Sequence, residues 1–158
     1  YCAAKDEKYY GFRGHLVING SGIITNFAFA KASIDERDVV PELTEGLTGL
    51  LIGDKGYIRP YLREKLLRRK LVLQTPFKKN MKDNRPKKFI RLLMAIRRRI
   101  ETIIGQLTER FHIQKVRARD WWHLSNRLSR KILAHIVCSF INCQLCRPAT
   151  QFDGLVKI

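Results

Sequence analysis

The sequence predicts a single α/β domain with a mixed order of strands and helices. Three observations support this fold class. Two β-rich segments joined by a turn are followed by a short helix, a buried strand and another helix. Two longer segments then repeat apolar residues at helical spacing. The length of 158 residues, with 45% hydrophobic content, suits one core. We therefore expect one domain over residues 1–158.

Local patterns predict four strands and four helices. The strands are short runs of aromatic, β-branched or aliphatic residues bounded by turn residues such as Asn19-Gly20-Ser21-Gly22. The helices begin near capping residues or proline, as at Asp35 and Pro60, and carry apolar residues at steps of three and four. The expected strands are residues 10–18, 23–30, 50–52 and 71–75, and the expected helices are residues 33–46, 61–70, 89–111 and 124–145.

The two long helices carry the largest apolar faces. The first has one continuous stripe that we expect to be buried, and the second has a face broad enough to be largely buried. Arg147-Pro148 ends the second helix, and residues 147–158 are expected to form a loosely held tail. The stripe comprises Leu93, Ile96, Ile100, Ile103, Ile104, Leu107 and Phe111, and the second face comprises Leu128, Ile132, Leu133, Ile136, Val137, Phe140 and Ile141.

Positive charge is concentrated in the middle of the chain. The formal net charge is +17, and residues 55–131 hold 24 lysines and arginines against 5 acids, whereas residues 1–54 hold 5 against 8. Such a stretch is the electrostatic footprint expected for a phosphate backbone. Residues 76–88 predict a basic loop that is mobile when nothing is bound. Anionic lipid is the rival partner, but this loop lacks the apolar face of a membrane-surface helix, and no apolar run is long enough to span a membrane.

Cysteine, histidine and tryptophan residues give weaker signals. Cys138, Cys143 and Cys146 have C-x4-C-x2-C spacing, but a fourth ligand and a loop context for an iron–sulfur or zinc site are lacking, which favours reduced structural thiols. His112, His123 and His135 lack metal-ligand spacing and are expected to be structural. Trp121-Trp122 follow a basic segment, where they would stack on a base or, by the alternative interpretation, pack where two helices meet.

Asp54 is the first candidate catalytic residue. It follows the apolar run Leu50-Leu51-Ile52 and is flanked by Gly53 and Lys55-Gly56. Open α/β sheets place their chemistry at the carboxyl ends of such strands. We do not expect Asp54 to cap a helix, because the next apolar helical pattern begins at Tyr61. The alternative is a solvated turn, since Asp and Gly are ordinary turn residues.

Glu101 is the second candidate. It lies beside the buried stripe, about 100° round the helix from Ile100, with Arg97 and Arg98 within helical reach. Carboxylates that converge from a strand and a helix can hold Mg²⁺, and two such ions would activate a water or a DNA 3′-hydroxyl for displacement at phosphorus. The alternative is an exposed ion pair with Arg97 or Arg98, worth a few tenths of a kcal/mol.

Three blocks of the sequence resemble those of bacterial insertion-sequence transposases of the DDE class. Their order and spacing make the resemblance specific, and it extends from Tyr9 to the tail. The blocks are Tyr9-Tyr10-Gly11-Phe12-Arg13-Gly14-His15-Leu16, Gly53-Asp54-Lys55-Gly56-Tyr57, and Arg98-Arg99-Ile100-Glu101-Thr102 with Gln106-Leu107.

The resemblance implies a ribonuclease H-like mixed sheet with flanking helices, in which three acids bind two Mg²⁺ for DNA strand cleavage and strand transfer. Asp54 corresponds to the second acid and Glu101 to the third. The first acid of the family lies on a strand upstream of Tyr9, so we expect this strand to be missing, the fold to be incomplete and the fragment to be inactive alone. Asp6, in a polar run, is expected at the surface. Met94 and Thr108 replace a Tyr and a Lys of related elements, which indicates a divergent branch.

The implied partners are DNA, as element ends and as target, and a further copy of the chain on DNA, in the bacterial cytoplasm and on the nucleoid when bound. Arg97, Arg98 and His15 are expected beside the acids, although a hydrogen-bonded structural role is the alternative for His15. The alternative function is a non-catalytic basic nucleic-acid-binding module; a ribosome-associated structural protein would explain the charge but not the two acids. The expected DNA-binding residues are Lys55, Lys78, Lys79, Lys82, Arg85, Lys87, Lys88, Arg117 and Arg119.

Overall fold

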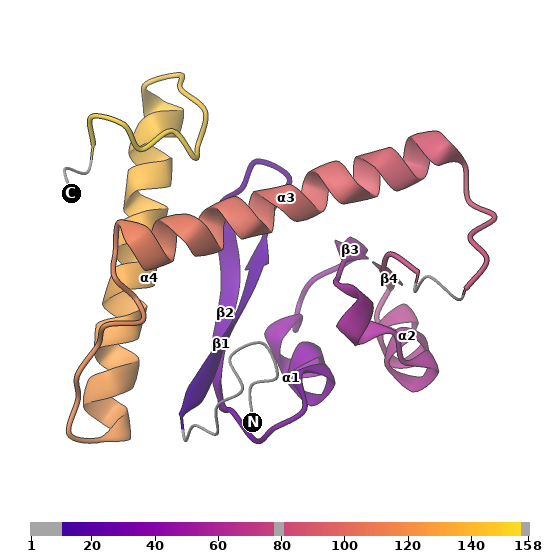
Figure 1. Cartoon of the computed structure of the whole chain (residues 1–158), viewed down its shortest axis with the longest axis horizontal. Coiled ribbons are helices and arrows are strands. Elements are labelled where there is room, and N and C mark those ends of the chain that lie inside the picture. Colours follow the sequence, from indigo (N-terminus) through magenta and orange to yellow (C-terminus); the bar gives the residue numbers. More distant parts are fainter. Residues whose placement is uncertain (1–10, 78–80, 156–158) are drawn as a thin grey trace.

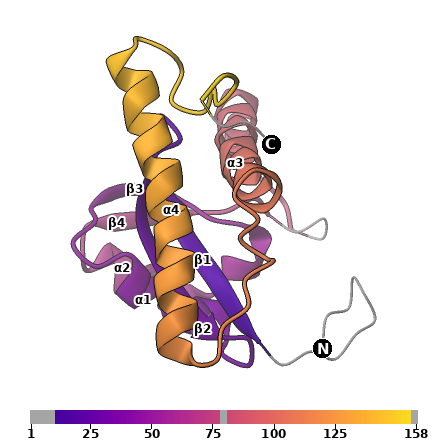
Figure 2. The same ribbon diagram turned by 90° about the vertical axis from the view of Figure 1, so that its left-hand side faces the viewer.

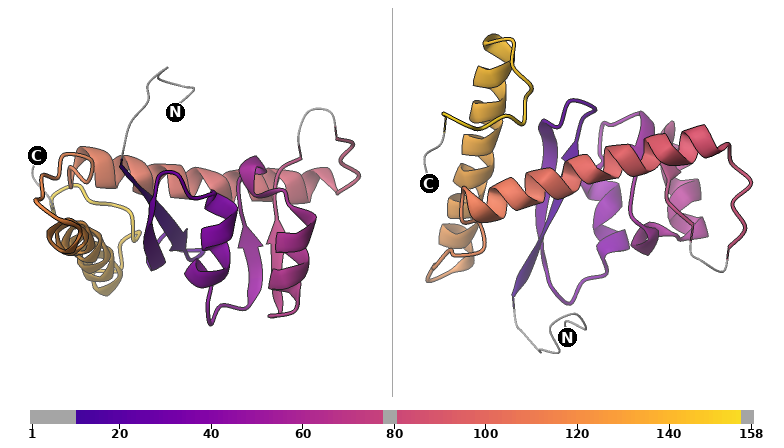
Figure 3. Two further views of the ribbon diagram at one scale, coloured as in Figure 1. Left: turned by 90° about the horizontal axis from the view of Figure 1, so that it is seen from below. Right: turned by 45° about the horizontal axis from the view of Figure 1, so that its top comes forward.

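The computed structural model describes residues 11–77 and 81–155 of the chain. The longest elements are two helices, and α3 runs across the molecule from the β3–β4 end to α4, with both sheets on one side of it (Figures 1 and 3). The elements, in chain order, are β1 (Phe12–Ile18), β2 (Ile24–Lys31), α1 (Glu36–Leu43), β3 (Gly49–Ile52), the one-turn 3-10 helix η1 (Lys55–Tyr57), α2 (Pro60–Leu67), β4 (Leu71–Gln74), α3 (Lys87–Glu109) and α4 (Trp121–Gln144).

The described residues form two small sheets. β1 and β2 pair antiparallel, with Phe12 opposite Lys31, and β3 and β4 pair parallel, with Gly49 opposite Leu71. The α/β class is therefore confirmed. The expectation of one mixed sheet is not met by these residues, because neither strand of the first pair is hydrogen-bonded to a strand of the second.

The first apolar core joins the parallel sheet to the two short helices. Leu66 of α2 is fully buried, and Tyr57 and Leu51 pack against the edge of the same cluster. Aliphatic residues on one face of each helix and on alternate strand positions produce this core. Its buried members are Val40, Leu62, Leu66, Leu71 and Leu73.

The second apolar core joins the β1–β2 hairpin to both long helices. Ile24 of β2 meets Ile103 and Leu107 of α3 and Ile132 of α4. Figure 2 shows α4 lying along the hairpin, with α3 beside it. Within the described residues, no helix has the length and apolar character needed to cross a membrane.

The face that α4 buries differs from the predicted one. His135, Ser139 and Asn142 are fully buried, and Leu128 and Ile132 lie on the same side of the helix. Several residues that the sequence placed in the core are exposed instead, as is Ile104 of α3. The reason is that a polar segment of the chain packs on this face of α4, where Asn142 donates hydrogen bonds to its backbone carbonyls. The exposed α4 residues are Leu133, Val137, Phe140 and Ile141.

That polar segment is the part of the tail that follows α4. Phe152 is only 1% exposed and packs against the His135 ring, with centroids 4.7 Å apart. The Gln106 side chain donates to the Thr150 carbonyl at 2.7 Å, and the Asn142 side chain donates to the Gln151 carbonyl at 2.6 Å. The expectation of a loosely held tail is therefore wrong for its described residues, because both long helices bind its backbone.

Candidate active site

Asp54 lies at the exit of β3, as expected. The Gly53 amide still donates to Gln74 at 2.9 Å, which extends the β3–β4 pairing up to Asp54. A Cβ atom on Gly53 would lie 3.2 Å from the Tyr57 ring, so glycine permits this close approach. Asp54 Oδ1 accepts a hydrogen bond from the Lys55 amide at 2.7 Å and caps η1. The expectation that Asp54 caps no helix is therefore wrong; the capped element is a one-turn 3-10 helix without an apolar pattern.

Arg97 of α3 brings Asp54 and Glu101 together. Its Nη2 lies 3.2 Å from Asp54 Oδ1 and 3.5 Å from Glu101 Oε1. The two carboxylate oxygens are thus no farther apart than these two distances laid end to end. The Arg97 side chain is 21% exposed, whereas those of Asp54 and Glu101 are 59% and 60% exposed. The partly shielded Arg97 guanidinium therefore contacts two carboxylates that are exposed to solvent.

The helix geometry of α3 explains why Arg97 and Glu101 meet. Residues four apart in a helix are neighbours on one face, so the two side chains lie one above the other. Asp54 comes from a separate element and joins them only because α3 packs along β3. The expected ion pair of Glu101 is present, and it coexists with the contact to Asp54.

Arg98 and His15 lie apart from this arrangement. Arg98 is exposed and forms no ion pair with a described residue, although its carbonyl accepts from the Thr102 hydroxyl. His15 is buried on β1, and burial lowers its pKa, with opposing effects from Glu36 and Arg13. Its charged neighbours therefore belong to α1 and β1, and its buried Nε2 has no hydrogen-bond partner among the described residues, so it is bonded to neither candidate acid.

The two carboxylates fit a divalent cation in their chemistry. Mg²⁺ takes oxygen ligands and is commonly bound through one or two carboxylates together with water and phosphate oxygens. The guanidinium between Asp54 and Glu101 indicates that this position favours positive charge. The described residues contain no group of three His, Cys, Asp or Glu side chains that would hold a metal ion. The site as described thus contains two carboxylates, fewer than such a group requires.

The expected DNA-binding residues separate into groups along α3. Lys55 is exposed directly beside Asp54, and Lys82, Lys87 and Lys88 are exposed at the N-terminal end of α3. Two more, Arg117 and Arg119, are exposed in the segment that leads from α3 to α4. Lys78 and Lys79 lie outside the described residues. The charge is therefore distributed along the length of α3 and is not confined to one loop.

Arg85 differs from the other expected DNA ligands. Its guanidinium pairs with Asp83 at 2.7 Å, donates to Gln74 Oε1 at 2.9 Å and to the Thr75 carbonyl at 3.0 Å, and stacks on Phe77. Hydrogen bonds from Arg85 hold the pKa of the Asp83 carboxyl below its usual range. Arg85 therefore anchors the segment before α3 to β4, and most of its donors are already bound within the protein. This also corrects the expectation of a mobile loop for residues 81–86.

The two tryptophans begin α4, which starts three residues earlier than predicted. The Asp120 side chain accepts from the His123 amide at 2.9 Å and caps the helix. Trp121 stacks on Phe12 of β1, with ring centroids 4.3 Å apart, while Trp122 is 67% exposed. Trp121 therefore fixes α4 to the hairpin, not to another helix as predicted. Asp120 itself was the sequence signal that would have located this helix start.

Sequence reasoning also missed residues that only the fold brings together. A hollow between the β1–β2 turn, α3 and the end of α4 contains Arg99, Ser21 and Thr150, which are far apart in the chain. The contact between Gln106 and His135, at 3.0 Å, likewise joins two helices. No local pattern marks either group.

Comparison with known proteins gives one result. A family model described as "Transposase DDE domain" matches residues 4–121, a range that contains Asp54, Arg97 and Glu101. Searches of the curated proteins and of the solved structures found no match.

Proposed function

The chain belongs to the transposase DDE domain family, and on this premise we propose that it acts as a DNA transposase catalytic domain, with Asp54 and Glu101 as the second and third acids of the site. The observation that carries the proposal is the single Arg97 nitrogen that contacts both carboxylates, at 3.2 and 3.5 Å. An exposed turn and an unrelated ion pair would have no reason to share that partner.

The three residues of the site have different proposed roles. Asp54 and Glu101 are the groups that would hold divalent cations, which when bound supply the activation of a water or DNA 3′-hydroxyl and the stabilisation of the leaving oxygen. Asp54 is fixed by the Lys55 amide, which accounts for part of the capacity of Oδ1. Arg97 offsets part of the charge of the two carboxylates and keeps them at short range until a more highly charged cation binds.

DNA would be held by the exposed basic residues along α3. Lys55 is adjacent to Asp54 in the chain and is suited to a phosphate next to the reacting one. Lys82, Lys87 and Lys88 at one end and Arg117 and Arg119 at the other would position the duplex without reading its sequence. Arg85 is not part of the proposed interface, because most of its donors are bound within the protein.

We also propose that the complete fold is ribonuclease H-like. The antiparallel pair β1–β2 and the parallel pair β3–β4 are the pieces expected on either side of a central strand. A strand that paired with β1 and with β3 would unite them into one mixed sheet and would bring its own end beside Asp54. Such a strand is where the first acid of the site is expected.

Mn²⁺ binding, followed by the loss of the electron paramagnetic resonance signal of the free ion, tests the proposal. We expect weak binding by the chain and its loss in Asp54→Asn and in Glu101→Gln, because each removes one of two ligands. Glu64→Gln is the matched control, since Glu64 is an exposed acid paired with Arg68 on α2. Equal Mn²⁺ binding by all four proteins would refute the site and leave a basic nucleic-acid-binding module.

Cleavage and strand transfer on DNA that carries element ends test the reaction itself. Activity that requires Mg²⁺ or Mn²⁺ and disappears in Asp54→Asn and Glu101→Gln is the expected pattern for the complete site. Activity retained by both variants would show that other residues perform the chemistry.

A further inference from the structure

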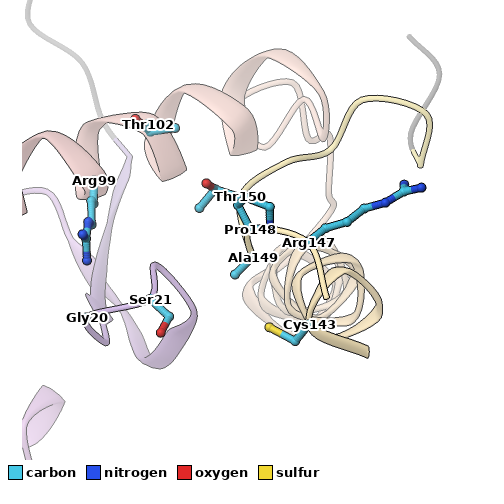
Figure 4. Close-up of a pocket in the computed structure, with 9 residues that line it drawn as sticks. All are labelled: Gly20, Ser21, Arg99, Thr102, Cys143, Arg147, Pro148, Ala149 and Thr150. Atoms are coloured by element: carbon cyan, nitrogen blue, oxygen red, sulfur yellow. The ribbon is translucent and has the colours of Figure 1, made fainter. Parts of the chain in front are cut away.

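A hollow of about 530 Å³ lies on the molecule where the β1–β2 turn, α3 and the end of α4 meet. Figure 4 shows the residues that line it, with the turn and α3 on one side and the segment after α4 on the other. The lining contains two arginines and three hydroxyl side chains and no carboxylate. Its residues are Gly20, Ser21, Arg99, Thr102, Cys143, Arg147, Pro148, Ala149 and Thr150.

The walls of the hollow are held in place by the protein itself. The Asn19 side chain accepts from the Ser21 and Ile23 amides, both at 3.0 Å, and so fixes the turn. Gly22 adopts a φ of +87°, and a Cβ atom there would lie 2.8 Å from the Thr150 methyl group, so only glycine fits. Gln106 holds the Thr150 carbonyl from the other side. The hollow is therefore formed before any ligand arrives, which reduces the ordering cost of binding.

Positive charge in the hollow comes mainly from Arg99. In the close-up its side chain extends from α3 toward Gly20 and Ser21, whereas the Arg147 guanidinium extends away from the hollow (Figure 4). Neither arginine forms an ion pair with a described residue. Arg97 and Arg110 on the same helix do, with Asp54 and Glu101 and with Asp153 respectively. Among the described residues, Arg99 therefore has no carboxylate beside it to offset its charge.

The hollow is separate from the candidate active site. Arg99 is two residues from both Arg97 and Glu101, and two residues correspond to about 200° of rotation round a helix. Arg99 therefore projects from roughly the opposite side of α3. A ligand in the hollow would not touch Asp54 or Glu101.

We propose that this hollow binds a phosphate group of a nucleic-acid backbone, with Arg99 as its charged ligand, the Ser21 and Thr150 side chains beside it, and Arg147 as a charge at the rim. A guanidinium with no acidic partner is the side chain best suited to a phosphate, and hydroxyls complete such sites. A bound duplex then contacts the protein on both sides of α3. A free phosphate ion shares this chemistry, and the experiment below separates the two sources.

Cys143 provides a direct probe, because its exposed thiol lines the hollow. Cys146 is also exposed but is not part of the lining, so it serves as an internal reference. The rates at which iodoacetamide alkylates the two thiols are measured by peptide mass spectrometry, with duplex DNA, with inorganic phosphate at equal ionic strength, and with neither. Arg99→Gln removes the proposed ligand charge, and Arg91→Gln removes an exposed charge elsewhere on α3.

We expect DNA to slow the alkylation of Cys143 by about fivefold relative to Cys146 in the wild-type chain and in Arg91→Gln, and by less than about twofold in Arg99→Gln. Arg99→Lys should restore most of the protection, because lysine restores the positive charge. This result would show that Arg99→Gln acts through the lost charge and not through a change in the helix. Protection by inorganic phosphate alone would identify a free-phosphate site, and protection by DNA alone a backbone site.

Equal protection in Arg99→Gln and Arg91→Gln, or none in the wild-type chain, would overturn the proposal. The result is independent of the proposed catalytic function, because Mn²⁺ binding at Asp54 and Glu101 is measured without DNA. Loss of Mn²⁺ binding with intact Cys143 protection would refute the catalytic site and leave this phosphate site standing.

Discussion

The end of the molecule around β3 and β4 is built from aliphatic side chains, whereas the end around α4 buries three polar ones. In the first, Leu62 and Leu66 of α2 cover Leu71 and Leu73 of β4. In the second, His135, Ser139 and Asn142 face the interior, and residues of the tail pack on them. α3 belongs to both ends, and Asp54 and Glu101 meet along it.

The comparison teaches that the two ends depend on different kinds of specificity. An aliphatic core is stabilised by area removed from water and tolerates changes of shape. A core with buried polar groups is stable only when each group finds its partner. At the α4 end Asn142 donates to the Gln151 carbonyl and His135 contacts Gln106, whereas the Ser139 hydroxyl is buried with no hydrogen-bond partner among the described residues.

The largest expected effect is that of Phe152→Ala. Phe152 is 1% exposed between the rings of Phe111 and His135. Its truncation would leave a cavity and remove the apolar contact that packs the tail on α4. We expect the free energy of unfolding to fall by about 3–5 kcal/mol, measured by urea denaturation. Phe140→Ala on the exposed side of α4 is the control, with an expected change below about 1 kcal/mol. Similar losses in both variants would mean that the tail does not belong to the core.

Acid should weaken the α4 end before the β3–β4 end. Burial lowers the pKa of His135 from 6.5 to about 4. The unfolded chain therefore binds this proton more readily, so the contribution to stability is complete above about pH 6.5 and is lost as the pH falls toward 4, by up to about 3 kcal/mol. His15, whose pKa burial also lowers, adds to the loss in the same direction.

Hydrogen exchange measured between pH 7 and pH 4.5 tests this order. After correction for the intrinsic pH dependence of exchange, amides of α4 should lose protection before those of β3 and β4, whose core buries no acid or histidine among the described residues. His135→Gln should flatten the dependence of stability on pH, whatever its effect on stability at pH 7. An unchanged slope in that variant would contradict the assignment to His135.

Gln106→Met should have an intermediate effect. The Gln106 amide donates to the Thr150 carbonyl at 2.7 Å, and its oxygen lies 3.0 Å from His135 Nε2. Methionine keeps the length of the side chain but leaves both partners unsatisfied, which should lower the free energy of unfolding by about 2 kcal/mol. Gln144→Met, at the exposed end of α4, should change it little. An unchanged free energy of unfolding in Gln106→Met would show that water hydrogen-bonds to the Thr150 carbonyl and to His135 equally well.

The same difference explains what the sequence predicts well. Strand and helix patterns at the β3–β4 end are local, so β3 and β4 were located to within one residue and α2 to within three, and Asp54 followed from them. On α4 the apolar pattern marked Leu133, Val137 and Phe140 as core, although they are exposed, because the pattern does not indicate which side another segment will cover. The helix itself was predicted, but the face of the helix that is buried was not.

The candidate site was partly predictable for a related reason. The spacing of Arg97 and Glu101 is helical and local, so their pairing was expected. That Asp54 would share the same Arg97 nitrogen depends on how α3 packs on β3, and no spacing encodes it. The internal bonds of Arg85 were missed because its partners Gln74 and Thr75 are eleven and ten residues away in the chain.

The smallest expected effect concerns Arg97, which joins the two ends at the candidate site. An exposed ion pair contributes at most about 1 kcal/mol to the position of a carboxylate. The repulsion between a guanidinium and a divalent cation about 4 Å away is about 2 kcal/mol even in water. Competition should therefore outweigh orientation, and Arg97→Ala should tighten the binding of Mn²⁺ by about threefold to tenfold.

Arg98→Ala is the matched control, because Arg98 has the same charge one residue away and forms no ion pair with a described residue. If long-range charge alone mattered, the two variants would tighten Mn²⁺ binding equally. If Arg97 mainly held the carboxylates in position, its removal would weaken binding. If Mn²⁺ must displace Arg97 from Asp54 and Glu101, binding should be tighter in Arg97→Ala and should change less in Arg98→Ala. The two variants differ in this way because, of the two arginines, Arg97 is the one that contacts both carboxylates.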